Sequence, residues 1–353
     1  MVNKGKVIVG MSGGVDSAVS AYLLKKEGFE VVGVTLGTVN RGEKGIRELE
    51  DAEKSAEIIG INFKSLDMAE LFHKCVMRPF AGEYARGRTP NPCIECNHYV
   101  KWEGLIRAAD ELKADYVATG HYAVIKCLEN GRYTVGQAAD KGKDQSYMLC
   151  KLSQEQLART ILPLGGMSKS QVRQIAEEAG LPVANKMDSQ EICFVTDGNY
   201  VDFIEETLNI TLPDEGDFVD EEGNILGRHK GIARYTVGQR KGLGLALGFP
   251  AYVKCVDPAG NQVVLGPEES LYRPNVICDD LNFMGVEDIG SGERISANVK
   301  IRYRHSGDHA VIERTENDSV KISFDRPVRA PAPGQSAVFY DESGYIIGAG
   351  KIR

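Results

Sequence analysis

The chain opens with a short apolar run, a glycine-rich turn and a helical pattern. The apolar run over residues 7–9 stops at Gly10, and the turn at residues 12–14 carries no bulky side chain. From Val15 to Gly28 the apolar residues recur at helical spacing. This pattern predicts a strand, a loop and a helix. A helix that begins directly after such a turn presents unpaired N–H groups and the positive end of its dipole, so we expect it to bind an anion, most naturally phosphate.

Strands and helices alternate through about the first two hundred residues. Such alternation is typical of an α/β domain with a parallel, doubly wound sheet. Ligands of these sheets bind beyond the carboxyl ends of the strands, which is where Ser12, Leu36 and Gly120 fall. We therefore expect three separate stretches to meet in one crevice. The predicted elements are strands at residues 30–36, 61–66 and 116–119 and helices at residues 47–59 and 99–112.

The pattern changes after about residue 205. Residues 202–222 hold nine acidic residues and no Lys or Arg, whereas residues 223–253 hold five basic residues and no acid. We expect this basic stretch to face phosphates, with a solvated surface as the plain alternative. Short alternating segments then continue to the C-terminus, as in small β barrels. The predicted domains are 1–205, a β-rich linker at 206–270 and a C-terminal β barrel at 271–353.

One predicted strand of this C-terminal region, residues 297–304, alternates apolar and basic side chains. Lys300, Arg302 and Arg304 fall on one face of it, next to an aromatic residue, Tyr303. A basic face with aromatic neighbours is a candidate surface for nucleic acid.

Composition limits the class of protein. The 353 residues carry a formal net charge of −8, and no apolar run is long enough to span a membrane. The N-terminus lacks the apolar segment of a signal peptide. We expect a soluble protein of the cytoplasm, in which eight cysteines do not form a disulfide framework.

The eight cysteines fall into two groups. Cys93 and Cys96 form a C-x-x-C within residues 89–97, a segment whose two prolines argue against a regular helix. Cys193 lies in a second loop-like stretch, so these three are candidates for chemistry. The other five lie within or beside apolar stretches and are expected in the core: Cys75, Cys127, Cys150, Cys255 and Cys278.

The glycine-rich turn belongs to neither of the two common phosphate motifs. No lysine follows the glycines, and the third glycine of a dinucleotide fingerprint is missing. A tight turn without a ligand is the plain alternative. The S-G-G-x-D-S sequence at residues 12–17 resembles the loop of the ATP pyrophosphatase (PP-loop) superfamily, with its adenine nucleotide alpha hydrolase-like fold. The resemblance implies that Ser12, Gly13, Gly14 and Ser17 grip pyrophosphate, and that Asp16 helps to hold magnesium.

A site that uses ATP to activate a carbonyl oxygen, combined with reactive thiols, suggests a sulfur-transfer reaction. If ATP converts a carbonyl oxygen to its adenylate, a sulfur nucleophile can displace AMP and leave C=S in place of C=O. This requires one thiolate to carry a persulfide and a second thiol to resolve it, and Cys193 and Cys96 fit these roles. A zinc site lacks partners for the C-x-x-C, whereas an iron–sulfur cluster held by Cys93, Cys96 and Cys193 stays open as an alternative.

Six motifs in order resemble the tRNA-specific 2-thiouridylase family over essentially the whole chain. The family's reaction would be adenylation and then 2-thiolation of the wobble uridine of certain tRNAs, with Cys96 as nucleophile and Cys193 as persulfide carrier. A cysteine desulfurase or sulfur-relay protein would supply the sulfur. The motifs are Gly10-Met-Ser-Gly-Gly-Val-Asp-Ser17, Thr89-Pro-Asn-Pro92 with Cys96-Asn97, Ala118-Thr-Gly-His-Tyr122, Lys143-Asp-Gln-Ser-Tyr147, Asp188-Ser-Gln-Glu-Ile-Cys-Phe194 and Tyr235-Thr-Val-Gly-Gln-Arg-Lys-Gly242.

The resemblance also implies binding residues, position by position. A flipped-out base would face the turn at residues 91–93. The residues implied for ATP are Gly10, Met11, Ser12, Gly13, Gly14, Val15, Asp16, Ser17, Leu36 and Gly120. The residues implied for tRNA are Asn91, Pro92, Cys93, His121, Lys143, Asp144, Gln145, Arg302, Tyr303 and Gln335.

The chain departs from the family pattern at two positions. Cys93 stands where the family usually has Asp, so an additional thiol could act as a ligand, a resolving thiol or a redox partner. Leu36 stands where the family has Met, which alters adenine packing. Two rival functions remain at this stage: another PP-loop ligase with a small substrate, and a nucleic-acid-binding scaffold that only senses ATP.

Overall fold

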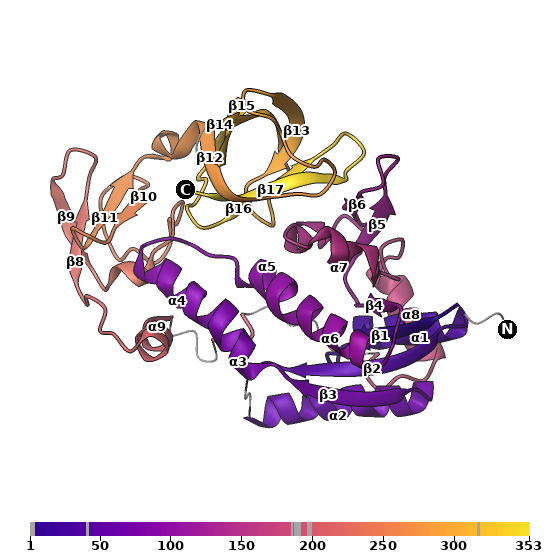
Figure 1. The fold of residues 1–353 in the computed structure, drawn as a ribbon. Coiled ribbons are helices and arrows are strands. Elements are labelled where there is room, and N and C mark those ends of the chain that lie inside the picture. Colours follow the sequence, from indigo (N-terminus) through magenta and orange to yellow (C-terminus); the bar gives the residue numbers. More distant parts are fainter. Residues whose placement is uncertain (1–3, 40–41, 185, 187–191, 196–199, 316–317) are drawn as a thin grey trace. The chain divides into compact units, whose positions relative to one another are not determined.

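The computed structural model describes residues 4–39, 42–184, 186, 192–195, 200–315 and 318–353 (Figure 1). The chain divides into two compact units. The first comprises Met1–Val76, Cys93–Phe194 and Ser343–Ile346, and the second comprises Met77–Pro92, Val195–Glu342 and Ile347–Arg353. Within the described residues, no helix is both long enough and apolar enough to cross a bilayer.

The first unit is built on a five-stranded parallel sheet, as the alternating pattern predicted. The strand order is β3-β2-β1-β4-β7, with Ile8 of β1 paired to Val32 of β2 and to Val117 of β4. The carboxyl ends of the three central strands therefore lie side by side. The strands are β1 (Lys6–Gly10), β2 (Glu30–Gly37), β3 (Asn62–Asp67), β4 (Tyr116–Ala118) and β7 (Thr160–Ile161).

Helices cover both faces of this sheet. The Val7 and Val9 face packs in one core with α1 (Val15–Lys26), α2 (Gly42–Ile59) and α8 (Lys169–Glu178). Gly10 points to the opposite face, where a Cβ on it would lie 3.2 Å from Leu105 of α6 (Glu103–Glu111). Alternate residues of β1 thus contact different helix layers, which is the doubly wound arrangement.

Two predicted helix boundaries in the first unit need correction. The helix predicted over residues 47–59 begins earlier, at Gly42. The segment predicted to avoid helix contains α5 (Pro92–Cys96), which continues into the π-helical turn η2 (Asn97–Trp102). Pro92 is the first residue of α5, where a proline needs no N–H and its fixed φ suits the helix.

Shorter elements complete the first unit. Strands β5 (Ala123–Cys127) and β6 (Tyr133–Gln137) form a hairpin. Ser168 and Gln171 form a capping box at the start of α8. The remaining elements are α3 (Ala69–Phe72), the π-helical turn η1 (His73–Met77, shared with the second unit), the 3-10 turn η3 (Ser146–Leu149) and α7 (Gln154–Ala158).

The second unit combines two helices, a small sheet and a closed barrel. Helices α4 (Arg78–Ala85) and α9 (Tyr200–Leu208) share a core around Ala81 and Ile204. The small sheet has the order β10-β11-β8-β9. Its strands are β8 (Gly216–Val219), β9 (Ile225–His229), β10 (Tyr252–Asp257) and β11 (Gln262–Gly266), with 3-10 turns η4 (Ile232–Arg234) and η5 (Glu268–Leu271).

The predicted C-terminal barrel is confirmed, with the closed order β12-β15-β14-β13-β16-β17. The strand predicted over residues 297–304 ends at Lys300, because the chain then turns and the His305 N–H donates to the Arg302 carbonyl. The barrel strands are β12 (Tyr272–Phe283), β13 (Arg294–Lys300), β14 (Asp308–Thr315), β15 (Ser319–Arg329), β16 (Ser336–Tyr340) and β17 (Ile346–Ile352).

The five cysteines predicted to lie in the core differ in their exposure to solvent. Cys150 and Cys278 are buried, and Cys75 is half-buried. Cys127 and Cys255 are exposed, so for them the prediction is wrong. Cys127 is the last residue of β5 in the two-stranded hairpin, and Cys255 lies at a register shift of β10.

Candidate active site

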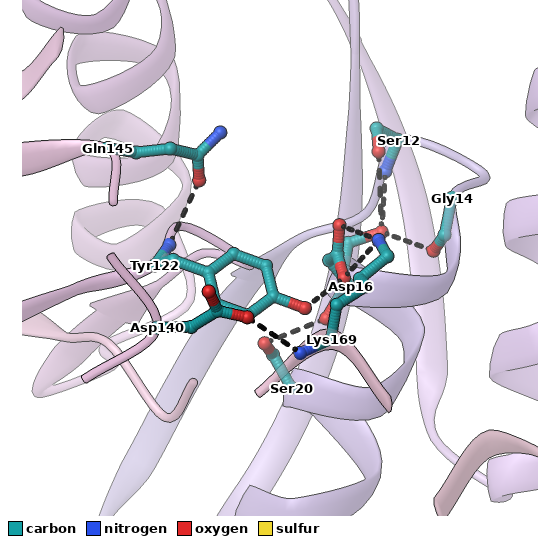
Figure 2. A network of polar contacts seen from close by, with 9 residues as sticks. Ser12, Gly14, Asp16, Ser20, Tyr122, Asp140, Gln145 and Lys169 are labelled. Atoms are coloured by element: carbon teal, nitrogen blue, oxygen red, sulfur yellow. Dashed lines mark hydrogen bonds and ion pairs between the residues drawn. The ribbon is translucent and has the colours of Figure 1, made fainter. Parts of the chain in front are cut away.

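The loop between β1 and α1 is held closed by its own hydrogen bonds (Figure 2). The Ser12 N–H donates to Ser17 Oγ at 3.2 Å, and Ser17 Oγ donates to the Gly14 carbonyl at 3.0 Å. Gly13 has φ +69°, and a Cβ there would collide with the Glu48 carbonyl of α2. Gly14 caps α1 without a side-chain hydrogen bond, so the start of the helix is left for an external acceptor.

Asp16, in the first turn of α1, is the centre of a polar network (Figure 2). Lys169 Nζ lies 2.8 Å from both carboxylate oxygens, and the Tyr122 hydroxyl donates to Asp16 Oδ1 at 2.7 Å. Ser20 donates to the Asp16 carbonyl at 2.9 Å. Three chain segments far apart in sequence therefore converge on one carboxylate.

The ends of β2 and β4 adjoin this loop. A Cβ on Gly120 would lie 2.7 Å from Asp16 C and Ser17 N, so only glycine lets β4 end this close to α1. In β2, Thr35 Oγ1 donates to the Met11 carbonyl at 2.6 Å. Leu36 lies against α6, since a Cβ on Gly104 would be 2.9 Å from Leu36 Cδ2. The structure thus brings the residues predicted for ATP to one edge of the sheet.

Sequence reasoning missed two lysines of this region. Lys169 binds Asp16, and Lys186 Nζ donates to the Gly13 carbonyl at 2.8 Å and to Asp51 of α2 at 2.7 Å. The Lys169 position could have been noticed, since it directly follows a capping-box serine at the start of a helix. No local pattern marks Lys186, which approaches the loop only through the fold.

The C-x-x-C thiols differ in exposure. Both lie on α5, where Cys96 is buried and Cys93 is exposed. Surrounding protein desolvates the Cys93 thiol although part of its surface stays open, and this raises its pKa. Two opposing electrostatic effects are smaller: Lys101 lowers that pKa, and the Cys193 thiol raises it. The Cys193 thiol therefore lies close enough to Cys93 to affect the pKa of Cys93.

Cys193 lies in an exposed turn. The next residue, Phe194, packs edge-on against Phe72 of α3 with ring centroids 5.5 Å apart. This contact fixes the C-terminal side of the turn to the first unit. Most of the motif on its N-terminal side, residues 187–191, lies outside the described residues.

His121 is largely desolvated and lies between the loop at residues 12–17 and the helical segment that follows the C-x-x-C thiols. Burial, with a smaller contribution from the charge of Lys101, lowers its pKa to about 3, so the ring is neutral near pH 7. Its Nδ1 lies 2.8 Å from Thr119 Oγ1, and its ring lies 5.6 Å from that of Trp102. Because Gly120 abuts α1 and Tyr122 bonds Asp16, residues 120–122 connect the nucleotide loop to the helix that carries the thiols.

The segment predicted to contact tRNA at residues 143–145 has internal roles as well. Asp144 is buried and accepts hydrogen bonds from Ala138 N–H and from the N–H and hydroxyl of Ser146. Gln145 Oε1 accepts the Tyr122 N–H at 2.9 Å. The Lys143 N–H donates to the Asp140 carbonyl. Asp144 and Gln145 thus order the segment, and contact with tRNA stays a prediction.

In the second unit, Gln335 is attached to the segment that precedes the thiols. Its Nε2 donates to the Thr89 carbonyl at 2.8 Å, and the Thr89 N–H donates to the Pro333 carbonyl at 2.7 Å. Arg88 donates to the Ile352 carbonyl at 3.0 Å. The residues predicted to face the base follow directly: Asn91 is half-buried, and Pro92 is buried at the start of α5.

The donor set was tested for metal binding. Among the residues that the structure describes, no group of three or more His, Cys, Asp or Glu side chains could hold a metal ion. Cys93, Cys96 and Cys193 therefore do not fit a cluster site here. Magnesium is different, because it is commonly held by one or two carboxylates together with substrate phosphates, and Asp16 fits that role.

Three family models match the chain in succession. They are described as a tRNA methyl transferase HUP domain at residues 5–197, a tRNA methyl transferase PRC-barrel domain at residues 201–267 and an aminomethyltransferase beta-barrel domain at residues 273–352.

Among similar solved structures are an NMN synthetase from Francisella tularensis, 21% identical with a TM-score of 0.35, and a 4-thiouridine synthetase–RNA complex with bound ATP, 17% identical with a TM-score of 0.36. The first match covers 60% of this chain and 79% of that one, and the second covers 58% and 50%. These likenesses are too weak to carry an argument.

Curated relatives match the chain from end to end. The tRNA-specific 2-thiouridylase MnmA of Lachnoclostridium phytofermentans is 47% identical over 358 residues, which cover 98% of this chain and 99% of the relative. The protein of the same name from Halothermothrix orenii is 42% identical and covers 99% of both chains. On this similarity, the chain belongs to the tRNA-specific 2-thiouridylase family.

Proposed function

We propose that this protein is a tRNA-uridine 2-sulfurtransferase, which uses ATP to replace the C2 oxygen of a wobble uridine in tRNA by sulfur. The observation that carries the proposal is the connection at residues 120–122 between a phosphate-binding loop and a helix bearing thiols. A full-length likeness to relatives named 2-thiouridylases supports it.

Methyl transfer is the alternative that two of the family-model descriptions would suggest. A loop shaped to hold pyrophosphate, with Lys169 beside it, has no task in a reaction that does not cleave ATP. Thiolation uses both the loop and the thiols. The loop therefore favours thiolation.

In the first step, the uracil C2 oxygen attacks the α-phosphorus of ATP, and pyrophosphate leaves. The N–H groups at the start of α1 and the loop at residues 12–17 bind the leaving phosphates. Lys169, which is paired with Asp16 beside the loop, contributes its positive charge to the binding of the phosphates. Asp16 would hold magnesium, which would neutralise charge on the phosphates.

In the second step, the terminal sulfur of a Cys193 persulfide attacks C2, and AMP leaves. The product is joined to Cys193 through a disulfide. A second thiolate attacks Cys193 Sγ, so that C2=S is released and a protein disulfide forms. A dithiol reductant then restores the two thiols, and a desulfurase or sulfur-relay protein reloads Cys193. Exposure of Cys193 in a turn supports its reloading by a protein partner.

The resolving thiol is Cys96 or Cys93. The family resemblance assigns Cys96, which is buried near the end of α5. Cys93 is exposed and electrostatically coupled to Cys193, and this observation favours Cys93. Peptide mapping of the disulfide formed during a single turnover distinguishes a Cys93–Cys193 bond from a Cys96–Cys193 bond.

The remaining assignments follow from the same proposal. Residues 1–205 carry catalysis, residues 206–270 link the two other domains, and residues 271–353 bind tRNA through Arg302 and Tyr303. Gln335 either contacts tRNA, as the family resemblance implies, or positions the segment before the thiols through Thr89. Residues 91–93, His121 and the segment 143–145 complete the tRNA contacts. The three family-model ranges support this division. Since tRNA is the substrate, we place the protein in the cytoplasm.

Pyrophosphate release and nucleoside analysis test the proposal together. Full-length protein, ATP, persulfide donor and an unmodified tRNA transcript are mixed, and the digested tRNA is analysed by mass spectrometry. We expect tRNA-stimulated pyrophosphate release and 2-thiouridine. Methylated uridine, or pyrophosphate release that ignores tRNA, would refute the proposal.

A further inference from the structure

Arginine and tyrosine side chains gather within the second unit. Tyr252 of β10 is buried, and the guanidinium groups of two arginines lie near its ring. Arg240 Cζ lies 5.9 Å from the ring centroid, and Arg329 Cζ lies 5.3 Å from it. Arg302 Nη1 donates to the Arg329 carbonyl at 2.9 Å. Tyr272 is paired with Arg329 across two strands. We call these residues the arginine–tyrosine patch: Arg240, Tyr252, Tyr272, Arg302 and Arg329.

An exposed ring lies beside the arginines. Tyr272 of β12 pairs directly with Arg329 of β15, and directly opposed residues of antiparallel strands point to the same face. The Tyr272 side chain is 43% exposed. A large exposed aromatic side chain next to guanidinium groups provides a surface on which a nucleic-acid base can stack.

Near the patch, the backbone at Gly238 lies very close to Ala330, at the end of β15. Gly238 has φ +87°, and a Cβ on it would lie 2.8 Å from the Ala330 Cβ. The Gly238 N–H donates to the Val253 carbonyl, and the Val253 N–H donates to the Gln239 carbonyl. These contacts fix Arg240 beside Tyr252. The glycine is therefore what allows the basic, glycine-rich stretch to reach the end of β15.

One carboxylate, that of Glu268, lies beside the patch. Glu268 forms an ion pair with Arg329 at 3.0 Å, and the Tyr252 hydroxyl lies 3.5 Å from the same carboxylate. Glu268 thus pairs with one guanidinium group of the patch, that of Arg329. In the same basic stretch as Arg240, Arg228 is paired with Asp217 at 2.8 Å, as expected of a solvated surface.

We infer that the arginine–tyrosine patch is a binding surface for the RNA phosphate backbone, with one unstacked base resting on Tyr272. The inference rests on the proposed function for the identity of the RNA, a tRNA. Arg240 and Arg302 bind phosphate oxygens, and the Tyr252 ring beside Arg240 helps to orient its guanidinium group. Arg329 is a positioning residue, because its guanidinium is held by Glu268 and its carbonyl by Arg302.

Salt-dependent binding of an unmodified tRNA transcript to the full-length protein tests the inference. Arg240→Ala is compared with Arg326→Ala, which removes an exposed arginine of the same strand as Arg329 but outside the patch. For Arg240→Ala we expect weaker binding and a slope of log affinity against log salt that is reduced by about 0.7 to 0.9, the value for one lost phosphate contact. Arg326→Ala should bind as the parent does. An unchanged slope for Arg240→Ala, or an equal loss for Arg326→Ala, overturns the inference.

Tyr272 provides a second, independent arm. Tyr272→Ala should weaken tRNA binding by about fivefold or more, whereas Tyr272→Phe keeps the ring and should bind as the parent does. Thermal unfolding checks that each variant is folded. Equal losses in both variants contradict stacking, and displacement of tRNA by polyglutamate of matched charge contradicts an RNA surface.

Thiolation at saturating tRNA separates this inference from the proposed function. Arg326→Ala should thiolate tRNA as the parent does, whereas Arg240→Ala should need a higher tRNA concentration to reach saturation. If the parent binds tRNA as described but makes no thiouridine, the proposed function fails and the patch stands. If the parent thiolates tRNA but Arg240→Ala leaves the salt dependence of tRNA affinity unchanged, the inference about the patch is wrong and the proposed function is supported.

Discussion

The nucleotide loop and the thiol region of the first unit are organised in opposite ways. The loop at residues 10–17 is contiguous in sequence and is held in shape by hydrogen bonds of Ser12 and Ser17 and by the Lys169–Asp16 ion pair. The thiols come from distant segments, and Cys93 and Cys193 are exposed while Cys96 is buried. The loop is thus shaped before ATP arrives, whereas the thiols must remain accessible to a tRNA base and a sulfur donor.

This difference suggests a division of labour. A preorganised site stabilises charge in the transition state without rearrangement, which suits the transfer of AMP. A thiol that alternates between persulfide, disulfide and free forms needs room to change partners. Disrupting either region should therefore stop a different half of the reaction.

The largest effect is expected from Cys193→Ser. Without the persulfide carrier, thiolation should be lost, while tRNA-dependent pyrophosphate release continues because the loop is untouched. Cys127→Ser, which alters another exposed thiol, is the matched control and should be fully active. Thiouridine formed at the parent's rate by Cys193→Ser would remove the persulfide assignment.

The loop is tested by Lys169→Met. Loss of a preorganised cation at the phosphates should slow ATP–pyrophosphate exchange by roughly a hundredfold. Lys169→Arg should recover part of the rate, and Lys54→Met, on the exposed side of α2, should have no effect. An exchange rate unchanged in Lys169→Met would show that the lysine serves only to hold Asp16.

A smaller effect is expected where the second unit holds the segment before the thiols. Gln335→Ala removes the hydrogen bond to the Thr89 carbonyl, and with about 1 kcal/mol at stake we expect roughly a fivefold lower turnover number. The affinity for tRNA should be unchanged, as measured by equilibrium binding. Weaker tRNA binding with unchanged turnover would instead favour the direct tRNA contact predicted for Gln335 from the sequence.

The smallest effect concerns pH. The pKa of His121 is lowered to about 3 in the folded protein, chiefly by burial, whereas an unfolded histidine titrates near 6.5. The unfolded state therefore binds the proton first. The stabilising contribution of neutral His121 is complete above about pH 6.5 and declines as the pH falls toward 3.

Thermal unfolding of the parent and of His121→Gln between about pH 7 and pH 5 measures this contribution. The parent should lose more stability over that range than the variant, because glutamine does not titrate. Parallel curves for the two proteins would contradict a neutral, desolvated His121.

The same contrast explains how much the sequence could predict. The parallel sheet, the loop at residues 12–17 and the closed barrel all follow from contiguous patterns, and the structure contains them. Lys186 reaches the loop only through tertiary folding, which no local pattern encodes. The prolines around Cys93 argue against a regular helix, but Pro92 starts one. The exposures of Cys127 and Cys255 depended on which strands remain uncovered.

The most direct test of the central claim is the stoichiometry of a single turnover. Protein loaded with persulfide is mixed with excess unmodified tRNA and ATP, and AMP, pyrophosphate and 2-thiouridine are quantified in the same quenched samples. We expect equal amounts of AMP and 2-thiouridine, limited by the persulfide carried on Cys193, and at least as much pyrophosphate. Thiouridine formed without AMP, or AMP formed in the absence of tRNA, would contradict the proposed mechanism.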